Sequence, residues 1–328
     1  MARVAVAGHI CVDVTPELPT GARIVPGQLI AVGPMAVRLG GCVANTGLAL
    51  RALGSDATLQ AVVGDDVLGG LIEQLLGDRG QVTRLPGCTT SYSVVVEPPG
   101  QDRTFWHHTG ANSHFDPDLV DVDADLLHVG YPPLLPGSLV ERAAPLCGLL
   151  DRARAAQATC SLDLAVVDRE SDVGRLDWDD LLSQVLPRTD VASPSADDLA
   201  SMLDPGAPPT LDRAEAWCDD LLRRGAAVAM VTAGANGLVL RSAGLDRVRA
   251  GGRVLAALGE EWDHALVRLP AVPSTSHVTA TGAGDAASAG LVHALTLGCT
   301  PQGAAELAAE TAATVMSGRS LSRVEVPR

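Results

Sequence analysis

The chain has 328 residues, 47% of them apolar, and its formal net charge of −15 at pH 7 disfavours non-specific binding to nucleic acid. This composition allows one large α/β domain or two smaller ones, and a charged fraction of 19% is typical of a globular enzyme rather than a disordered chain. The sequence contains no lysine, which excludes a P-loop with its lysine, a pyridoxal-phosphate Schiff base and a lysine-dependent aldolase.

The N-terminal segment predicts one buried strand followed by an irregular, β-rich excursion. Arg3–Ile10 is a largely apolar run, as expected for a strand buried on both faces of a parallel sheet. Asp13 follows it, and a carboxylate at the carboxyl end of a strand can reach the hydroxyl groups of a ligand, although a turn aspartate fits equally well. Prolines and glycines between Thr15 and Arg38 leave only short β-prone pieces, at 23–25, 28–32 and 35–39.

A pair of glycines, Gly40 and Gly41, opens the next predicted helix. Glycines at a helix N-terminus let a ligand approach the backbone, and Asn45 in the first turn can both donate and accept hydrogen bonds. A plain glycine turn before a helix is the alternative. A strand over 58–63, a glycine turn and a helix over 68–76 follow, and this repetition predicts βαβ units and a doubly wound sheet.

The segment 89–112 predicts a second β excursion. Thr89–Glu97 and Arg103–His107 have the composition of the two halves of a hairpin. With the first excursion, these strands could form a lid that excludes water from the site at Asp13. Histidines gather here, and lid or surface positions are favoured over a metal site because no acidic residue completes helical ligand spacing. They are His107, His108 and His114.

The remainder of the chain continues the alternation of strands and helices. Strands are predicted over 125–130, 159–165, 190–193, 227–232 and 238–241, and helices over 139–156, 214–224 and 300–317. The segment His277–Gly290 has the sequence HVTATGAGDAASAG, in which a glycine turn leads into a run of small helix-compatible residues. A helix that begins there would direct free N–H groups at an anion, and Asp285 would either accept a proton or cap the helix.

Seven scattered cysteines without a CxxC pair are typical of reduced thiols in a cytosolic protein. The N-terminal apolar run is too short for a signal peptide, and no apolar run reaches the length of a membrane span. We therefore expect a cytoplasmic protein that binds neither membranes nor nucleic acid.

Several motifs together resemble those of the ribokinase-like (PfkB-type) family of ATP-dependent carbohydrate and nucleoside kinases, and the resemblance covers nearly the whole chain. The matching segments are Gly40-Gly41 with Asn45, VVGDD at 62–66, DRTF with GAN at 102–105 and 110–112, VTAGANG at 231–237, and Thr281-Gly282-Ala283-Gly284-Asp285. The resemblance implies a single kinase domain over 1–328. Its fold would be a doubly wound, mostly parallel sheet flanked by helices, with a small β lid formed by 14–38 and 89–112.

The family pattern also implies roles for individual residues. Asp285 would be the base that takes the proton from the substrate hydroxyl, and the backbone of Gly282, Ala283 and Gly284 would form an anion hole for the transferring phosphoryl group. Such a transfer needs mainly positioning and charge stabilisation, so ATP and Mg²⁺ suffice as cofactors without a lysine. The implied substrate-binding residues are Asp13, Gly40, Gly41, Asn45, Arg103 and Asn112. The implied ATP-binding residues are Ser195, Thr232, Gly234, Gly237 and Thr281.

Three positions depart from the family pattern. Thr279 stands where the family usually has an aspartate that helps to bind a monovalent cation, which leaves activation by potassium open. The family's Asn-x-x-Glu motif is reduced to Ser195–Asp198, so Asp198 would hold a metal ion only through water. Cys42 stands where ribokinases proper carry a lysine, and this argues against ribokinase itself.

These observations favour a kinase that phosphorylates a hydroxyl group of a small sugar or sugar derivative, because DRTFWHHTGAN is closer to the sugar-kinase branch of the family. A nucleoside kinase is the alternative, with Phe105 and Trp106 as a clamp for the base. A ligand-binding pseudokinase is a further alternative, although the retention of Asp285 speaks against it. The exposed strand edges of the lid suggest a homodimer.

Overall fold

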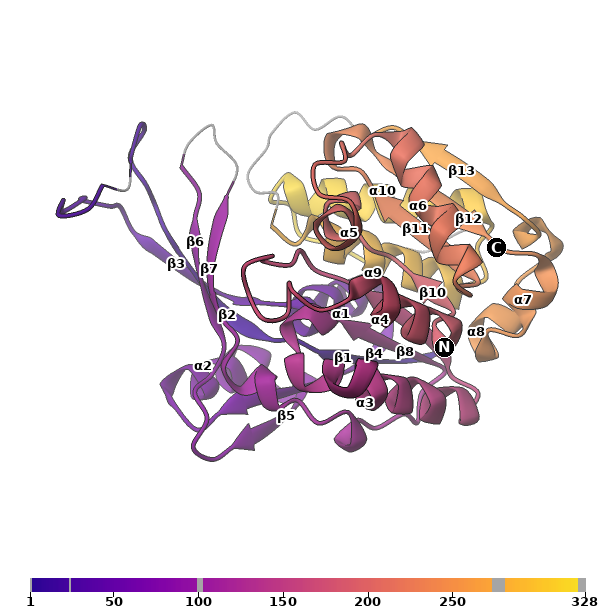
Figure 1. The fold of residues 1–328 in the computed structure, drawn as a ribbon, viewed down its shortest axis with the longest axis horizontal. Coiled ribbons are helices and arrows are strands. Elements are labelled where there is room, and N and C mark those ends of the chain that lie inside the picture. Colours follow the sequence, from indigo (N-terminus) through magenta and orange to yellow (C-terminus); the bar gives the residue numbers. More distant parts are fainter. Residues whose placement is uncertain (1, 24, 99–102, 273–280, 324–328) are drawn as a thin grey trace.

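The computed structural model describes residues 2–23, 25–98, 103–272 and 281–323 (Figure 1). A nine-stranded sheet runs through the described part of the chain in the order β13-β12-β11-β10-β9-β8-β1-β4-β5. From β11 to β5 every neighbouring pair is parallel, whereas β12 is antiparallel to both of its neighbours. The strands are β1 Arg3–Gly8, β4 Asp56–Gly64, β5 Gly80–Leu85, β8 Leu126–Gly130, β9 Thr159–Asp163, β10 Val191–Ala192, β11 Val228–Thr232, β12 Leu238–Ser242 and β13 Leu266–Leu269.

Apolar side chains cover both faces of the central strands, which is why these strands appear as nearly continuous apolar runs in the sequence. In β1, Val4 and Val6 point to one face, and Ala5 and Ala7 point to the other. All four residues are buried, because a separate layer of helices covers each face. The predicted doubly wound, mostly parallel sheet is therefore confirmed.

Two helical layers form the core with the sheet. One layer contains α1, α2, α8, α9 and α10, and the other contains α3, α4, α5 and α6. The helices are α1 Cys42–Leu53, α2 Val67–Leu76, α3 Pro136–Ala155, α4 Trp178–Val185, α5 Ala196–Leu203, α6 Leu211–Arg223, α7 Leu245–Arg249, α8 Gly252–Ala256, α9 Ala283–Thr296 and α10 Pro301–Met316. Helix α3 is interrupted by a left-handed turn at Glu141–Ala143, just before Pro145.

A second sheet of four strands projects from one end of the large sheet (Figure 1). Its order is β3-β2-β6-β7, with β2 Cys11–Pro16, β3 Met35–Gly40, β6 Tyr92–Val96 and β7 Thr104–His108. The predicted lid segments 14–38 and 89–112 contain most of these residues, although β2 begins three residues earlier, at Cys11. The role of this small sheet as a lid and its pairing in a dimer remain predictions.

Several element predictions were wrong in detail. The β-prone pieces at 23–25 and 28–32 form no strand at the residues described there, and only 35–39 does so, as β3. Strands β5 and β13 were not predicted. Both lie at edges of the large sheet, where alternating polar residues weaken the apolar signal.

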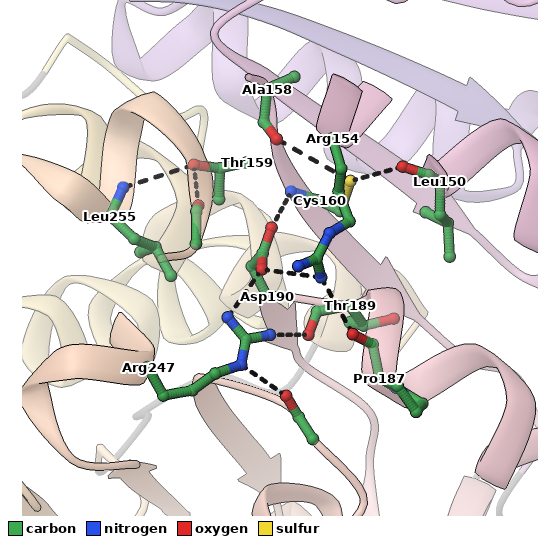
Figure 2. A network of polar contacts seen from close by, with 12 residues as sticks. Leu150, Arg154, Ala158, Thr159, Cys160, Pro187, Thr189, Asp190, Arg247 and Leu255 are labelled. Atoms are coloured by element: carbon green, nitrogen blue, oxygen red, sulfur yellow. Dashed lines mark hydrogen bonds and ion pairs between the residues drawn. The ribbon is translucent and has the colours of Figure 1, made fainter. Parts of the chain in front are cut away.

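The buried carboxylate of Asp190 fastens the amino ends of the central strands β9 and β10 (Figure 2). It accepts hydrogen bonds from the backbone N–H of Cys160 at 2.8 Å and from Arg247 at 3.0 Å, and Arg154 lies 3.6 Å away. Arg247 also donates to the carbonyl groups of Thr189 and Gly225, so it ties α7 to the sheet. Because this network lies at the amino ends of the strands, it serves stability and leaves the carboxyl ends for a ligand.

Candidate active site

Asp285 lies in the first turn of α9, beside the carboxyl ends of the central strands. The preceding Gly282 has a φ of 79°, a left-handed conformation that glycine adopts without strain. The first N–H groups of a helix have no partner within it, so the backbone of Gly282–Gly284 can bind an anion. Among the described residues, no atom beyond the helix's own turn lies within 4 Å of the place that a Cβ on Gly284 would occupy. This side of the turn is open.

Three side chains hold the Asp285 carboxylate. Tyr131 donates its hydroxyl hydrogen to Oδ2 at 2.7 Å, and the Asn45 amide donates to the same oxygen at 3.0 Å. Thr46 donates to Oδ1 at 3.0 Å. Burial of Asp285 raises its pKa above the ordinary value, and these hydrogen bonds act in the opposite direction. The carboxylate is thereby fixed in orientation while it remains a better proton acceptor than an exposed aspartate.

Tyr131 was not singled out from the sequence, yet it is one of the closest partners of Asp285. It follows β8 directly and has φ 63° and ψ 48°, a left-handed conformation that is uncommon for a residue other than glycine. Burial and the charge of Asp285 raise the pKa of Tyr131 well above its ordinary value, so its hydroxyl stays protonated and acts as the donor. The backbone strain is the cost of placing this hydroxyl at the carboxylate.

The predicted substrate residues Asp13, Gly40 and Gly41 meet where the small sheet joins the large one. Asp13 on β2 is paired with Arg38 on β3, and a Cβ on Gly40 would collide with the Asp13 carboxylate. Gly41 has a φ of 85°, and a Cβ there would lie 2.5 Å from Nδ1 of His9. The glycine pair therefore makes room for two side chains. The charge of Asp13 raises the pKa of Asp285, so the two carboxylates face one region.

Asn112 and Arg103 differ in their surroundings. Asn112, in the short 3-10 helix Gly110–His114, is fully buried and donates to the carbonyl of Ile10 at 2.8 Å. Arg103 precedes β7, and its guanidinium carbon lies 5.6 Å from the ring centroid of Phe105. The first residue is thus built into the junction, whereas the second belongs to the outer part of the small sheet.

Ser195 and Thr232, two predicted ATP residues, are neighbours through a parallel bridge between the ends of β10 and β11. Ser195 caps α5, where Asp198 accepts from the Ser195 N–H at 2.7 Å and donates its own N–H to the Ser195 hydroxyl at 3.1 Å. Burial raises the pKa of Asp198 to about 6. One carboxylate oxygen of Asp198 is thus engaged in the helix cap, and the predicted contact with a metal ion through water stays a prediction.

The other predicted nucleotide residues differ in their surroundings. Gly234 is exposed with a φ of 55°, and no described atom would contact a Cβ on it. Gly237 has a φ of 108°, and a Cβ on it would collide with the carbonyl of Leu269 at the end of β13, so packing alone requires this glycine. Thr281 directly precedes the turn of α9 and is half-buried. Thr279 lies outside the described residues.

A second buried carboxylate, Asp163, ends β9. It accepts from the Ser288 hydroxyl at 3.2 Å, and Ser288 lies one turn after Asp285 on α9. The Ser193 hydroxyl lies 2.9 Å from that of Ser288. Burial, together with the charges of Asp285 and Asp198, raises the pKa of Asp163 well above its ordinary value. Both Tyr131 and Asp163 stand at strand ends, which is the same signal that identified Asp13.

The described residues contain no group of three or more His, Cys, Asp or Glu side chains arranged to hold a metal ion. Two of the clustered histidines have hydroxyl partners instead. A ring nitrogen of His107 lies 3.0 Å from the Ser93 hydroxyl, and one of His108 lies 2.8 Å from the Thr89 hydroxyl. Within the described part of the chain, no helix has the length and apolar character needed to cross a membrane.

Comparison with known proteins gives the family. A model of the pfkB family carbohydrate kinases matches residues 1–326. Among solved structures, the Arabidopsis thaliana ribokinase complexed with ribose and ATP has a TM-score of 0.71 at 17% identity, over 98% of this chain and 96% of its own. The Methanocaldococcus jannaschii nucleoside kinase has a TM-score of 0.69 at 18% identity, over 98% and 95% of the two chains. A microbiome-derived acarbose kinase, Mak1, has a TM-score of 0.68 at 21% identity, over 99% and 96%. At these identities the structural likenesses establish the fold, and the fold predicted from the sequence is confirmed.

Proposed function

The chain belongs to the pfkB family of carbohydrate kinases, and on that premise we propose that it transfers the γ-phosphoryl group of ATP to a hydroxyl group of a small sugar or sugar derivative. The observation that carries this proposal is the buried carboxylate of Asp285 in the first turn of α9, held by Tyr131, Asn45 and Thr46. A carboxylate at the positive end of a helix, with its orientation fixed, suits a general base beside an anion site.

In this proposal Asp285 accepts the proton of the substrate hydroxyl while the hydroxyl oxygen attacks the γ-phosphorus atom of ATP, and the bond from that atom to the β–γ bridging oxygen breaks so that ADP leaves. The raised pKa of Asp285 makes it a more effective acceptor, and the side chains of Tyr131 and Asn45 fix the direction of Oδ2. Asp13, Gly40, Gly41 and Asn45 would surround the substrate hydroxyl groups. The charge of Asp13 contributes to the raised pKa of Asp285, and this nearness supports the grouping.

The anion site would be the backbone of Gly282, Ala283 and Gly284. Charge develops on the transferring phosphoryl group, and preorganised N–H groups stabilise it without a reorganisation cost. This arrangement suits a chain without lysine, because the helix terminus supplies the positive potential. The open space beside Gly284 supports an approach of the phosphoryl group from that side.

Family members use ATP with Mg²⁺, and when bound this ion would neutralise charge on the phosphates. Mg²⁺ takes oxygen ligands and usually keeps several waters with one or two carboxylates. The donor set here fits such a cation, because Asp163 and Asp198 are both buried carboxylates. Burial and the charges of Asp285 and Asp198 raise the pKa of Asp163, and a cation beside these groups would offset the repulsion between them. Ser195, Thr232, Gly234, Gly237 and Thr281 would line the nucleotide.

A nucleoside kinase is the second candidate. Phe105 and Trp106 on β7 are 44% and 53% exposed, in a chain with few aromatic side chains, and a base could stack on either ring. The structural likeness to the Methanocaldococcus jannaschii nucleoside kinase is compatible with it.

ATP consumption measured against a panel of sugars and nucleosides tests the proposal. Asp285→Asn is the inactive control, and Asp197→Asn, at an exposed position on α5, is the matched control. Turnover of a sugar that only the first variant abolishes would support the proposal. Turnover of nucleosides alone would favour the second candidate. No turnover by the wild-type chain would favour a ligand-binding pseudokinase, and full activity of Asp285→Asn would refute the base assignment.

A further inference from the structure

Three polar side-chain atoms are buried at the junction of the two sheets without a hydrogen-bond partner among the described residues. They are Nδ1 of His9, Nε2 of His107 and Oδ1 of Asn112. His9 is 2% exposed and Asn112 is fully buried. The His9 and His107 ring centroids are 5.0 Å apart, and Asn112 donates to the carbonyl of Ile10, the residue after His9. A buried polar atom without a partner is uncommon and requires an explanation.

The hydrogen-bond partners of His9 identify its free nitrogen as an acceptor. Nε2 of His9 lies 3.4 Å from the Ser91 hydroxyl, and that hydroxyl donates its single hydrogen to the carbonyl of His108 at 2.8 Å. Ser91 must then accept from Nε2–H of His9. The proton of a neutral His9 is accordingly on Nε2, so Nδ1 carries a free lone pair. Nδ1 faces the backbone of Gly41, where a Cβ would lie 2.5 Å from it, so the glycine leaves room beside this nitrogen.

The same reasoning applies to His107. Its Nδ1 lies 3.0 Å from the Ser93 hydroxyl. Burial raises the pKa of Asp13, and interactions with the side chains of Cys11 and Ser93 act in the opposite direction. When the Ser93 hydroxyl directs its hydrogen to Asp13, it accepts from Nδ1–H of His107, and Nε2 of His107 is then a second free acceptor. Burial lowers the pKa of His9 well below its ordinary value and that of His107 to about 4, so both rings are neutral at pH 7.

The free group of Asn112 is also an acceptor, because its amide N–H donates to Ile10 and its Oδ1 has only lone pairs. Asp13 adds a carboxylate that is partly exposed beside these atoms. We call His9, His107, Asn112 and Asp13 the acceptor cluster. Its unpaired atoms accept hydrogen bonds and donate none, and its only charge is negative. It lies next to the candidate base, because the His9 ring stacks on Tyr131 at 6.0 Å between centroids.

We propose that the acceptor cluster is the specificity-determining part of the substrate site, and that it selects a substrate which presents O–H or N–H donors and rejects one which presents a carboxylate or phosphate. The inference rests on the proposed function and narrows its substrate class to neutral, hydroxyl-rich sugars and amino sugars. A hydroxyl group can donate to His9 or His107, whereas a carboxylate has no hydrogen to give and would meet Asp13 as a like charge.

The positions of His9 and His107 also indicate how a substrate would reach their free nitrogens. His9 lies at the end of the large sheet, between β1 and β2, whereas His107 lies on β7, the edge strand of the small sheet. A substrate that reaches both nitrogens therefore has to separate the two rings by a small displacement of the small sheet. The unpaired acceptors favour that displacement, because the substrate donors satisfy them.

A comparison of matched substrates tests the proposal. Equilibrium binding by calorimetry and steady-state kinetics are measured with glucose, glucosamine, gluconate and glucose 6-phosphate, and with the corresponding ribose series. We expect the tightest ligand of each series to be a neutral or amino sugar, and the acid and the phosphate to bind at least about tenfold more weakly. Tighter binding of an acid or phosphate, or the absence of binding by any sugar, would overturn the proposal.

His107→Phe removes one acceptor and keeps an aromatic ring. His108→Phe is the matched control, because the neighbouring residue of a strand points to the opposite face. We expect His107→Phe to raise the KM for the preferred sugar about tenfold with little change in kcat. The ratio of the affinities for the neutral sugar and for the acid should also fall in this variant. His108→Phe should leave the KM and this ratio unchanged. Equal KM values in the two variants would refute the role of His107.

His9→Asn, with an acceptor on a shorter side chain, probes the buried ring, and a melting curve checks its folding. Unchanged selectivity in a folded His9→Asn variant would also count against the cluster. Calorimetry separates this proposal from the proposed function. A wild-type chain that binds neutral sugars but consumes no ATP would retain the acceptor cluster and refute the kinase activity. Turnover of sugar acids with consumption of ATP would support the kinase activity and refute the role of the acceptor cluster.

Discussion

The Tyr131 hydroxyl donates a hydrogen bond of 2.7 Å to Oδ2 of Asp285 across 154 positions of the chain. This contact joins the end of β8 to the start of α9, and it requires a left-handed backbone at Tyr131. Non-glycine residues in such conformations persist only where the surrounding structure enforces them, and they concentrate at functional sites. The pair is therefore the most informative contact in the candidate site.

Tyr131→Phe should lower kcat about tenfold with little change in KM, because two of the three donors to Asp285 remain. The lost hydrogen bond lowers the pKa of Asp285 in the native protein, so its removal raises that pKa. Since the base acts when ionised, the acidic limb of the kcat profile should move to higher pH. The exposed Tyr92→Phe is the matched control. An unshifted pH profile of kcat would show that the Tyr131 hydroxyl does not affect the proton affinity of the base and that the side chain serves packing alone.

The pKa of Asp198, raised to about 6, makes stability depend on pH. Between about pH 4 and pH 6 the folded chain binds more protons than the unfolded chain, so the free energy of unfolding falls as the pH rises through this window. Asp198→Asn removes the buried charge and keeps an oxygen that can accept from the Ser195 N–H. We expect it to raise the free energy of unfolding at pH 7 by at most about 3 kcal/mol. Urea denaturation at pH 4 and pH 7 measures the difference, which should vanish at the lower pH.

Arg247→Ala should destabilise the chain without affecting catalysis. It leaves the buried Asp190 carboxylate with Cys160 N–H and the more distant Arg154 as partners (Figure 2). Removal of one partner of a buried ion pair costs about 3–5 kcal/mol, and the remaining partners should hold the loss near the lower end. Arg249→Ala, in the last turn of the same helix, is the control. A loss of kcat that exceeds the loss of folded protein would contradict the purely structural role.

The sequence predicted the architecture well because apolar strands and glycine turns are local signals. The large sheet and the helices that follow Gly41 and Gly282 could be found from spacing alone, and the family match confirms the resemblance. Strand β5 was not predicted from the sequence because, as an edge strand, it carries polar residues among its apolar ones. The piece at 28–32 has strand-forming residues, but none of the strands among the described residues pairs with it, so its propensity was overridden.

The candidate site was predictable only in its glycine motifs. Tyr131 and Thr46 take their roles from contacts with a residue more than 150 positions away, and no local pattern encodes that distance. His9 was part of an apolar run in the sequence, and its role depends on a hydrogen bond to Ser91, the residue before β6. Strand ends were the usable signal, since Tyr131 and Asp163 both stand where a parallel strand stops.

Gly284→Ala separates the anion site from the fold. The position is exposed in the first turn of α9, and a Cβ there would enter open space, so the folded chain can accommodate it. Alanine favours a helix by about 0.5–1 kcal/mol over glycine, so the melting temperature should stay the same or rise slightly. The added methyl group would stand where the phosphoryl group must approach, and kcat/KM for ATP should fall at least about tenfold.

Gly282→Ala is the contrasting variant. Its φ of 79° is unfavourable for alanine, so we expect destabilisation of about 1–2 kcal/mol together with the loss of activity. Melting curves and initial rates with ATP varied at saturating sugar distinguish the two effects. If Gly284→Ala retained the wild-type kcat/KM for ATP, the phosphoryl group would have to bind away from this turn, and Asp285 would lose its place beside the reacting atoms. A stable but inactive Gly284→Ala chain would instead tie the phosphoryl group to the N-terminus of α9.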